Sequence, residues 1–273
     1  MPPKDLLAIV PDASAENVFA AAQALSDRWR AHAAILQLTE FPTLAGGEAA
    51  FTAELWADVV AKMRQTAAAE HEKILRRLDL FERTGEARSA EIPAGAAERV
   101  AAFHALHADL TIVARPVREI DIAALEGALF KSGRPILVIP PDWRGGPIGK
   151  RILVAWTPKR EAARALADAQ IFLSEAEHVS VVTVDAAPVI DDAALPGVAI
   201  ATHLARHELD VELRQIDGAG RPAEVAILAE ARAMDADLIV MGGYGHSRLR
   251  EFILGGATRG MLETSPIPVL MSH

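Results

Sequence analysis

Short apolar runs of four to six residues alternate along the chain with amphipathic stretches of helical period. Runs that are apolar throughout are typical of strands covered on both faces, and their alternation with helices predicts βαβ units around a parallel sheet. We expect helices over residues 49–83, 161–174 and 222–234. The expected strands are residues 6–10, 35–38, 110–114, 136–139, 152–156, 179–184, 211–216, 238–241 and 269–271.

The two halves of the sequence repeat one pattern. The run DLLAIV at residues 5–10 matches KRILVA at 150–155 with an offset of 145, which also carries Glu16 onto Glu161. The run ADL recurs at an offset of 128 (108–110 and 236–238), and the runs PIL and PVL match at an offset of 133 (135–137 and 268–270). The first copy is therefore longer through its middle, and the second is longer between its last two strands. We expect two domains, residues 1–145 and 149–273, joined by a linker rich in proline and glycine.

The longer middle of the first copy contains the expected helix over residues 49–83. Leu55, Val59 and Met63 recur there at helical spacing, which favours a helix that packs on the first domain. Two alternatives stay open, namely that this helix covers the ligand site of the first domain or that it binds a partner.

Composition narrows the class of protein. About half of the 273 residues are hydrophobic, the formal net charge is −9, and cysteine is absent. These values favour a globular protein without disulfides or thiolate metal sites. An acidic chain with few aromatic residues lacks the basic surface and the stacking platforms of nucleic-acid-binding proteins. No apolar run is long enough to cross a membrane, and no signal peptide is apparent, so we expect a cytoplasmic protein.

A glycine-rich segment follows the expected strand at 238–241. Gly242, Gly243 and Gly245 come directly after it, and Gly255 and Gly256 precede a helix that we expect to open at Ala257. Glycines let backbone N–H groups approach a ligand closely, and a helix N-terminus attracts anions. Both features lie at the carboxyl ends of parallel strands, where open α/β sheets bind ligands. The segment therefore predicts a phosphate site to which Thr258 adds a hydroxyl; tight packing of helix on sheet is the competing interpretation.

Spaced as Gly-x2-Gly-x9-Gly, the glycines at 242, 245 and 255 resemble the nucleotide-phosphate motif of the universal stress protein family. The flanking runs DADLIVM (235–241) and SPIPVL (265–270) are similar to those of the family as well. The resemblance implies Rossmann-like domains of the adenine nucleotide alpha hydrolase-like kind, each a five-stranded parallel sheet of order 3-2-1-4-5. It implies ATP or a related adenine nucleotide as a ligand in some members and none in others. It also implies dimerisation through the last strand, so that a tandem chain pairs its own two domains at residues 136–139 and 269–271; a homodimer of the chain is expected too.

The motif and the resemblance together imply a nucleotide site in the second domain. Two residues that differ from those of the ATP-binding family members count against this prediction. The ATP-binding members place serine or threonine where this chain has Gly256, and an aspartate where it has Thr157. The first copy has Asp12 in that register, but Ala114 and Val117 replace two of its glycines, so we expect no nucleotide there. The implied site residues are Ala155, Thr157, Val184, Met241, Gly242, Gly245, Arg248, Gly255, Gly256, Ala257 and Thr258.

Three function classes remain at this point. The first is a non-catalytic stress-response protein whose second domain binds a nucleotide, and the second is an interaction scaffold whose glycines are structural. An enzyme such as a nucleotidyltransferase or pyrophosphatase is the third and least favoured, because no catalytic motif and no lysine beside the glycine loop appear; slow hydrolysis of a bound nucleotide stays open. No metal site is expected, since the spaced pairs His203 and His207, and His104 and His107, lack a third ligand.

Overall fold

The computed structural model describes residues 2–43, 53–81, 85–185, 197–243 and 256–273. The chain divides into two compact units, residues 2–134 (the N-terminal unit) and residues 135–273 (the C-terminal unit). Each unit alternates strands and helices, which gives the expected α/β fold. No helix among the described residues is long and apolar enough to span a membrane.

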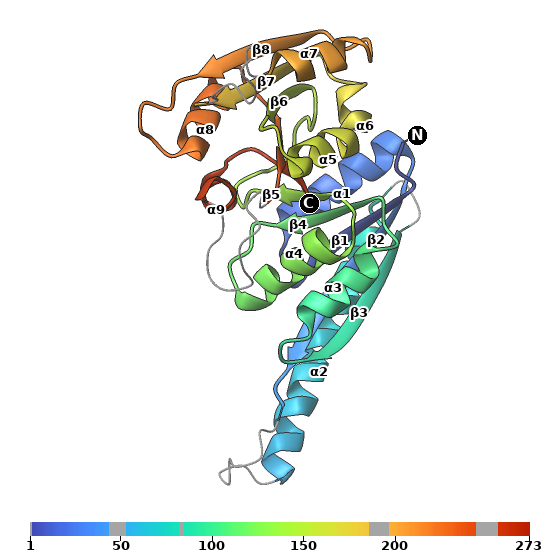
Figure 1. Cartoon of the computed structure of the whole chain (residues 1–273). Helices are drawn as coiled ribbons and strands as arrows, with labels where there is room; N and C mark the ends of the chain where they lie inside the picture. Colours follow the sequence, from blue (N-terminus) through green and yellow to red (C-terminus); the bar gives the residue numbers. More distant parts are fainter. Residues whose placement is uncertain (1, 44–52, 82–84, 186–196, 244–255) are drawn as a thin grey trace. The chain divides into compact units, whose positions relative to one another are not determined.

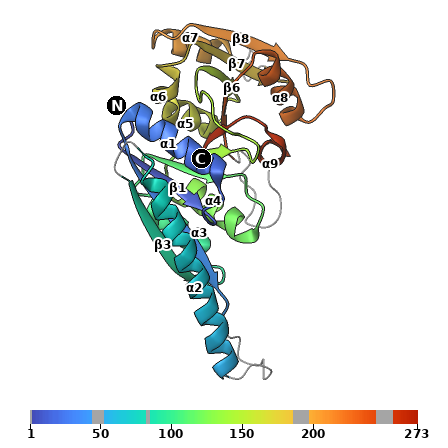
Figure 2. The same ribbon diagram turned by 180° about the vertical axis from the view of Figure 1, so that it is seen from behind.

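The N-terminal unit has four parallel strands in the order β3-β2-β1-β4. Helices α3 and α4 lie in front of these strands in Figure 1, and α1 and α2 lie in front of them in Figure 2, so both faces of the sheet are covered. This explains why β1 and β4 are apolar nearly throughout. The elements are β1 (Asp5–Val10), α1 (Glu16–Trp29), β2 (His32–Phe41), α2 (Ala53–Leu78), β3 (Gly85–Pro93), α3 (Ala97–Ala105), β4 (Leu110–Ala114) and α4 (Glu119–Lys131).

The C-terminal unit has six strands in the order β5-β10-β9-β6-β7-β8. Strands β6 to β10 are parallel, whereas β5 pairs antiparallel with β10, with Leu137 opposite Leu270. This pairing confirms that the two segments expected to meet, 136–139 and 269–271, do so. The elements are β5 (Ile136–Ile139), β6 (Arg151–Ala155), α5 (Arg160–Asp168), α6 (Gln170–Leu173), β7 (His178–Val184), α7 (Val198–Ala205), β8 (Val211–Ile216), α8 (Ala223–Ala233), β9 (Leu238–Gly242), α9 (Gly256–Thr264) and β10 (Val269–Ser272).

The repeated run ADL has the same structural role in both units. The Asp237 carboxylate accepts hydrogen bonds from the backbone N–H groups of Gly149, Lys150 and Arg151, which lead into β6. The Asp109 carboxylate does the same for the backbone N–H groups of Lys4 and of Asp5, the first residue of β1. In each unit an aspartate thus satisfies donors at the start of the central strand, where the sheet leaves them unpaired.

Strand pairing corrects the expected alignment of the two copies by one residue. Leu6 lies opposite Leu110 in one unit, and Ile152 lies opposite Leu238 in the other. Leu6 therefore corresponds to Ile152, at an offset of 146 and not 145. The helix that follows begins at Glu16 in the first copy and at Arg160 in the second. With Leu6 aligned to Ile152, the loop between strand and helix is therefore two residues longer in the first copy.

The correction also changes the interpretation of Asp12. In the sheet register Thr157 corresponds to Pro11, and Asp12 lies in the longer loop of the first copy. There the Asp12 carboxylate accepts hydrogen bonds from the backbone N–H and the hydroxyl of Ser14, at 2.8 and 2.5 Å. The Asp12 carboxylate therefore stabilises a turn within its own loop.

The expected packing of α2 comes from its second half. Ala67, Ile74 and Leu78 are buried, whereas Leu55 is 48% exposed, and Val59 and Met63 are half-buried. The prediction that the first three apolar positions pack this helix on the unit was therefore wrong for Leu55. The second half of α2 lies against β2 and β3, while the first half extends beyond the other helices of this unit (Figure 1).

Candidate functional site

The candidate residues of the C-terminal unit lie at the carboxyl ends of three neighbouring strands. Ala155 ends β6, opposite Val182 of β7 and Met241 of β9, and Val184 ends β7. Thr157 follows β6 with an exposed side chain. Strands β7 and β8 extend to one side of β6, and β9 and β10 to the other, so the site lies where the strand order reverses. Open α/β sheets bind their ligands at this point.

The glycine loop is described only at its two ends. Gly242 is the last residue of β9, and Gly256, Ala257 and Thr258 form the first turn of α9. The predicted contacts of Gly245, Arg248 and Gly255 lie outside the described residues. Thr258 is buried, with 5% of its surface exposed.

Close packing by itself requires glycine at position 242. A Cβ atom there would lie 2.6 Å from the backbone nitrogen of Ala162 and 2.7 Å from the backbone carbon of Glu161, both at the start of α5. Backbone atoms cannot yield to such an approach without moving the helix. Packing against α5 therefore explains why position 242 is a glycine, whether or not a ligand binds.

Gly256 differs from Gly242 in having open space around it. Among the described residues outside its own helix turn, a Cβ atom at this position would meet no atom within 4 Å, and its φ angle lies outside the left-handed region. The first turn of α9 carries no acidic residue. The described end of the loop is therefore accessible and compatible with an anionic ligand, because helix N-termini carry a partial positive charge.

Arg160, Glu161 and His273 form a cluster that the sequence interpretation missed. The Arg160 Nε donates to Oε1 of Glu161 at 2.6 Å, and its Nη2 lies 3.2 Å from Nε2 of His273. The other ring nitrogen of His273, Nδ1, lies 3.0 Å from the backbone oxygen of Gly243. These contacts join the start of α5 to the residue after β10 and to the residue after β9, directly before the glycine loop.

The charge of Glu161 is stabilised inside this cluster. Burial raises the pKa of Glu161, but the hydrogen bond and the charge of Arg160 and a backbone N–H outweigh it, so its pKa lies below the ordinary value. Only 10% of the side chain is exposed. The Arg160 side chain is 76% exposed, so solvent screens this ion pair from the arginine side.

We expect Glu161→Gln to lower stability in a pH-dependent way. A carboxylate with a depressed folded-state pKa contributes stability above its unfolded-state pKa, and this contribution is lost as the pH falls through the folded-state value. The variant should be less stable than the wild type at pH 7, and the difference should shrink below about pH 4. Urea unfolding at several pH values measures this, and a difference that persists unchanged at pH 3 would contradict it. Glu208→Gln, on an exposed side chain of the same unit, is the control.

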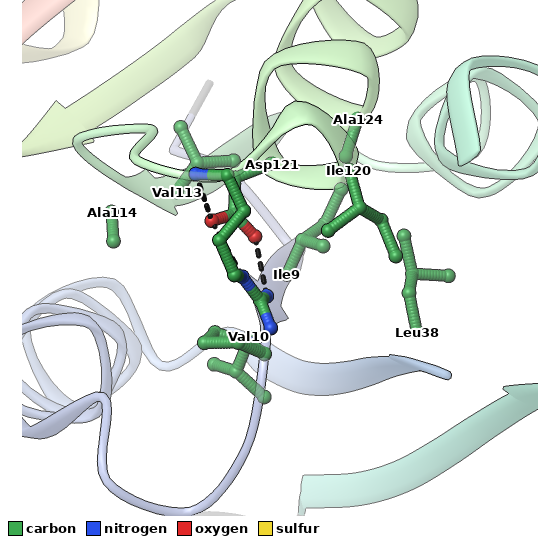
Figure 3. Close-up of a pocket in the computed structure, with 10 residues that line it drawn as sticks. Ile9, Val10, Leu38, Val113, Ala114, Ile120, Asp121 and Ala124 are labelled. Carbon is green, nitrogen blue, oxygen red and sulfur yellow. Dashed lines mark hydrogen bonds and ion pairs between the residues drawn. The ribbon is translucent and has the colours of Figure 1, made fainter. Parts of the chain in front are cut away.

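The N-terminal unit contains a hollow at the corresponding strand ends. It measures about 40 Å³ and has mostly apolar walls, including Val10, Leu38 and Ala114 (Figure 3). Pockets for small molecules usually reach about 300–1,000 Å³, so this hollow holds a few water molecules at most. Its size fits the expectation that the first copy binds no nucleotide, which stays a prediction.

An internal carboxylate occupies the helix start beside this hollow. Asp121 of α4 accepts hydrogen bonds from the backbone N–H of Arg118 at 3.1 Å and from the Arg118 guanidinium at 2.6 and 3.0 Å. Burial raises the pKa of Asp121, but these bonds and a backbone bond from Val117 lower it overall. Helix α4 follows β4 as α9 follows β9, so the two helix starts are equivalent. At the start of α4 the backbone N–H of Arg118 is bonded to Asp121 of the same helix, whereas the first turn of α9 has no acidic residue.

Helix α2 holds the β1–α1 loop of the N-terminal unit in place. The Glu70 carboxylate accepts a hydrogen bond from the backbone N–H of Ala13 at 3.2 Å, and the Arg77 guanidinium donates to the backbone oxygen of Ala13 at 3.3 Å. Arg77 also forms an ion pair with Glu16 and lies 4.6 Å from the ring centroid of Phe19. These contacts place α2 against the β1–α1 loop and the start of α1, while no α2 residue lines the hollow at the strand ends, so coverage of the ligand site of the first domain stays a prediction.

The histidine pairs show no metal-binding arrangement in the part of the chain that the structure describes. The rings of His203 and His207 pack edge-on with centroids 4.8 Å apart. Within the described ranges, no group of three or more histidine, aspartate or glutamate residues is placed to hold a metal ion.

Comparisons with known proteins connect this geometry to one family. The sequence of residues 149–273 matches the model of the universal stress protein family. A universal stress protein from Archaeoglobus fulgidus DSM 4304 is similar over 97% of each chain, with 17% sequence identity and a TM-score of 0.71. A putative universal stress protein from Pseudomonas aeruginosa UCBPP-PA14 is similar over 99% of this chain and 93% of its own, with 16% identity and a TM-score of 0.60. No curated protein matches the sequence.

Proposed function

We propose that residues 149–273, which match the model of the universal stress protein family, bind ATP or a related adenine nucleotide as a regulatory ligand. The binding site consists of the carboxyl ends of β6, β7 and β9, the glycine loop and the first turn of α9. The role is binding, and no catalytic step is assigned to any residue. The N-terminal unit is a degenerate copy that binds no nucleotide.

One observation carries this proposal, namely the difference between the two equivalent helix starts. The start of α4 is neutralised by Asp121, whereas the first turn of α9 has no acidic residue and Gly256 has open space around it. An anion can approach the second start, whereas at the first the Asp121 carboxylate already accepts the hydrogen bonds of the Arg118 backbone N–H and guanidinium. The glycine pattern that begins at Gly242 and ends before α9 lies between a strand end and this helix start, as a phosphate site requires.

Calorimetric titration of the full chain with ATP tests the proposal. We expect one binding site per chain, because the N-terminal hollow is too small for a nucleotide. Gly256→Glu should weaken ATP binding about tenfold, or 1.4 kcal/mol, because it places a carboxylate at the start of α9 as Asp121 does for α4. Gly256→Gln, which has the same shape without the charge, is the matched control.

Three outcomes would contradict the proposal. Absence of ATP binding by the wild-type chain would refute the nucleotide role. Two sites per chain would refute the assignment of the N-terminal unit as a non-binding copy. Equal affinities of Gly256→Glu and Gly256→Gln would show that the start of α9 does not face the phosphates.

A nucleotide-free interaction scaffold is the second candidate function. The contact of Gly242 with α5 favours it, because this contact explains a motif glycine through packing alone. Under this alternative the wild-type chain takes up no nucleotide in the same titration.

A further inference from the structure

We propose that Arg160 is the cation that binds the phosphate groups of the nucleotide in the C-terminal unit. This inference rests on the proposed function and adds to it a residue outside the glycine motif. It also accounts for how the site can hold phosphates although Gly256 lacks the hydroxyl that the ATP-binding members of the family have there.

The position of Arg160 in the fold supports this role. It is the first residue of α5 and follows β6, the strand at which the strand order reverses. Through His273 its guanidinium is connected to the backbone oxygen of Gly243, the last described residue before the glycine loop. Arg160 therefore lies after the end of β6 and beside Gly242 and Gly243, the described residues that precede the glycine loop.

The contacts of Arg160 orient its guanidinium and leave most of it accessible. The two side-chain contacts, to Glu161 and His273, engage Nε and Nη2. A guanidinium has five N–H donors, so at least three remain for a ligand. The side chain is 76% exposed. Glu161 and His273 thus hold the head group in place from one side while the other side faces solvent.

An arginine at this position has an electrostatic cost that a ligand would offset. Cations are disfavoured in the first turn of a helix, where the N-terminus is already positive, and Arg160 is the first residue of α5. Glu161 in the same turn balances this charge, and the several negative charges of a triphosphate would add a further favourable interaction with the exposed side of the guanidinium. A planar guanidinium also matches phosphate oxygens in a bidentate geometry, which makes arginine a preferred phosphate ligand.

Another described arginine of the C-terminal unit serves as the matched control. Arg164, one turn further along α5, pairs with Asp168 at 2.8 Å, and Arg259 of α9 pairs with Glu263 at 2.6 Å. Both carry the same charge on exposed helix surface and pair with an acid on their own helix. Arg259 lies in the first turn of α9, within the proposed site, so Arg164→Ala is the control that changes the net charge as Arg160→Ala does.

Titration of the full chain with ATP and, separately, with adenosine tests the inference. Arg160→Ala should weaken ATP binding about tenfold and leave adenosine binding unchanged, because the guanidinium contacts only the phosphates. Arg160→Lys should keep part of the ATP affinity, since it retains the charge without the bidentate geometry. Arg164→Ala should bind both ligands as the wild type does.

The outcomes separate this inference from the proposed function. ATP binding by the wild type that Arg160→Ala leaves unchanged would refute the inference alone. An equal loss of ATP and adenosine affinity in Arg160→Ala would also refute it, because the residue would then act through the fold of the site. A wild-type chain that binds neither ligand would refute the proposed function, and the inference with it.

Discussion

Gly242→Ala is expected to destabilise the C-terminal unit by about 3 kcal/mol or more, the upper range for overpacked positions. The added methyl group would meet backbone atoms of Glu161 and Ala162 at 2.6–2.7 Å. These atoms belong to the first turn of α5, which packs against β9, so relief requires a shift of the whole helix. Urea unfolding without nucleotide, followed by circular dichroism, measures the loss.

Gly256→Ala is the matched control for this substitution. Its Cβ would occupy open space at the start of a helix, and alanine has a higher helix propensity than glycine, so stability should stay the same or rise slightly. A Gly242→Ala variant as stable as the wild type would contradict the packing argument and would leave a ligand contact as the reason for this glycine.

The strands of this fold were predictable wherever they are buried on both faces. Residues 110–114 and 136–139 were expected as strands, and they are β4 and β5, which are buried nearly throughout. Strand β3 (Gly85–Pro93) was missed because its sequence, GEARSAEIP, contains few apolar residues, and most of its positions are partly or fully exposed. Tertiary pairing with β2 makes it a strand, and no local pattern in the sequence carries that information.

The same apolar character caused the error of one residue in the repeat. In strands that are apolar on both faces, a shift by one position exchanges one hydrophobic residue for another, so the sequence does not fix the register. Asp109 and Asp237 do fix it, because each caps the start of its central strand. The repeated run ADL could be aligned from the sequence, but the sequence did not show which strand start its aspartate caps.

The missed cluster shows the limit of sequence interpretation at the site. Arg160 and His273 are 113 positions apart, and only the pairing of β10 with β9 brings the last residue close to the start of α5. One local signal was available, since a cation in the first turn of a helix opposes the helix dipole. The glycines of the motif were identified, but the sequence could not separate the packing role of Gly242 from a role in binding.

Restoring two side chains should strengthen nucleotide binding by the C-terminal unit. Gly256→Ser adds a hydroxyl at the start of α9, and a hydrogen bond to phosphate contributes about 1.5–3 kcal/mol at best. Thr157→Asp adds a carboxylate on an exposed position after β6. Its gain should be smaller, because the carboxylate favours the nucleoside but repels the phosphates. Together the substitutions should raise the ATP affinity about ten- to a hundredfold, as measured by calorimetric titration.

The structure removes the main objection to this experiment. The Cβ of a serine at position 256 meets no atom of the described residues outside its own helix turn and needs no left-handed backbone, so we expect the variant to unfold at the same temperature as the wild type in the absence of ligand. A correctly folded double variant whose ATP titration stays flat would therefore not be explained by a damaged loop. It would show that the glycines serve packing, as Gly242 does against α5, and the scaffold function would be the better account of this chain.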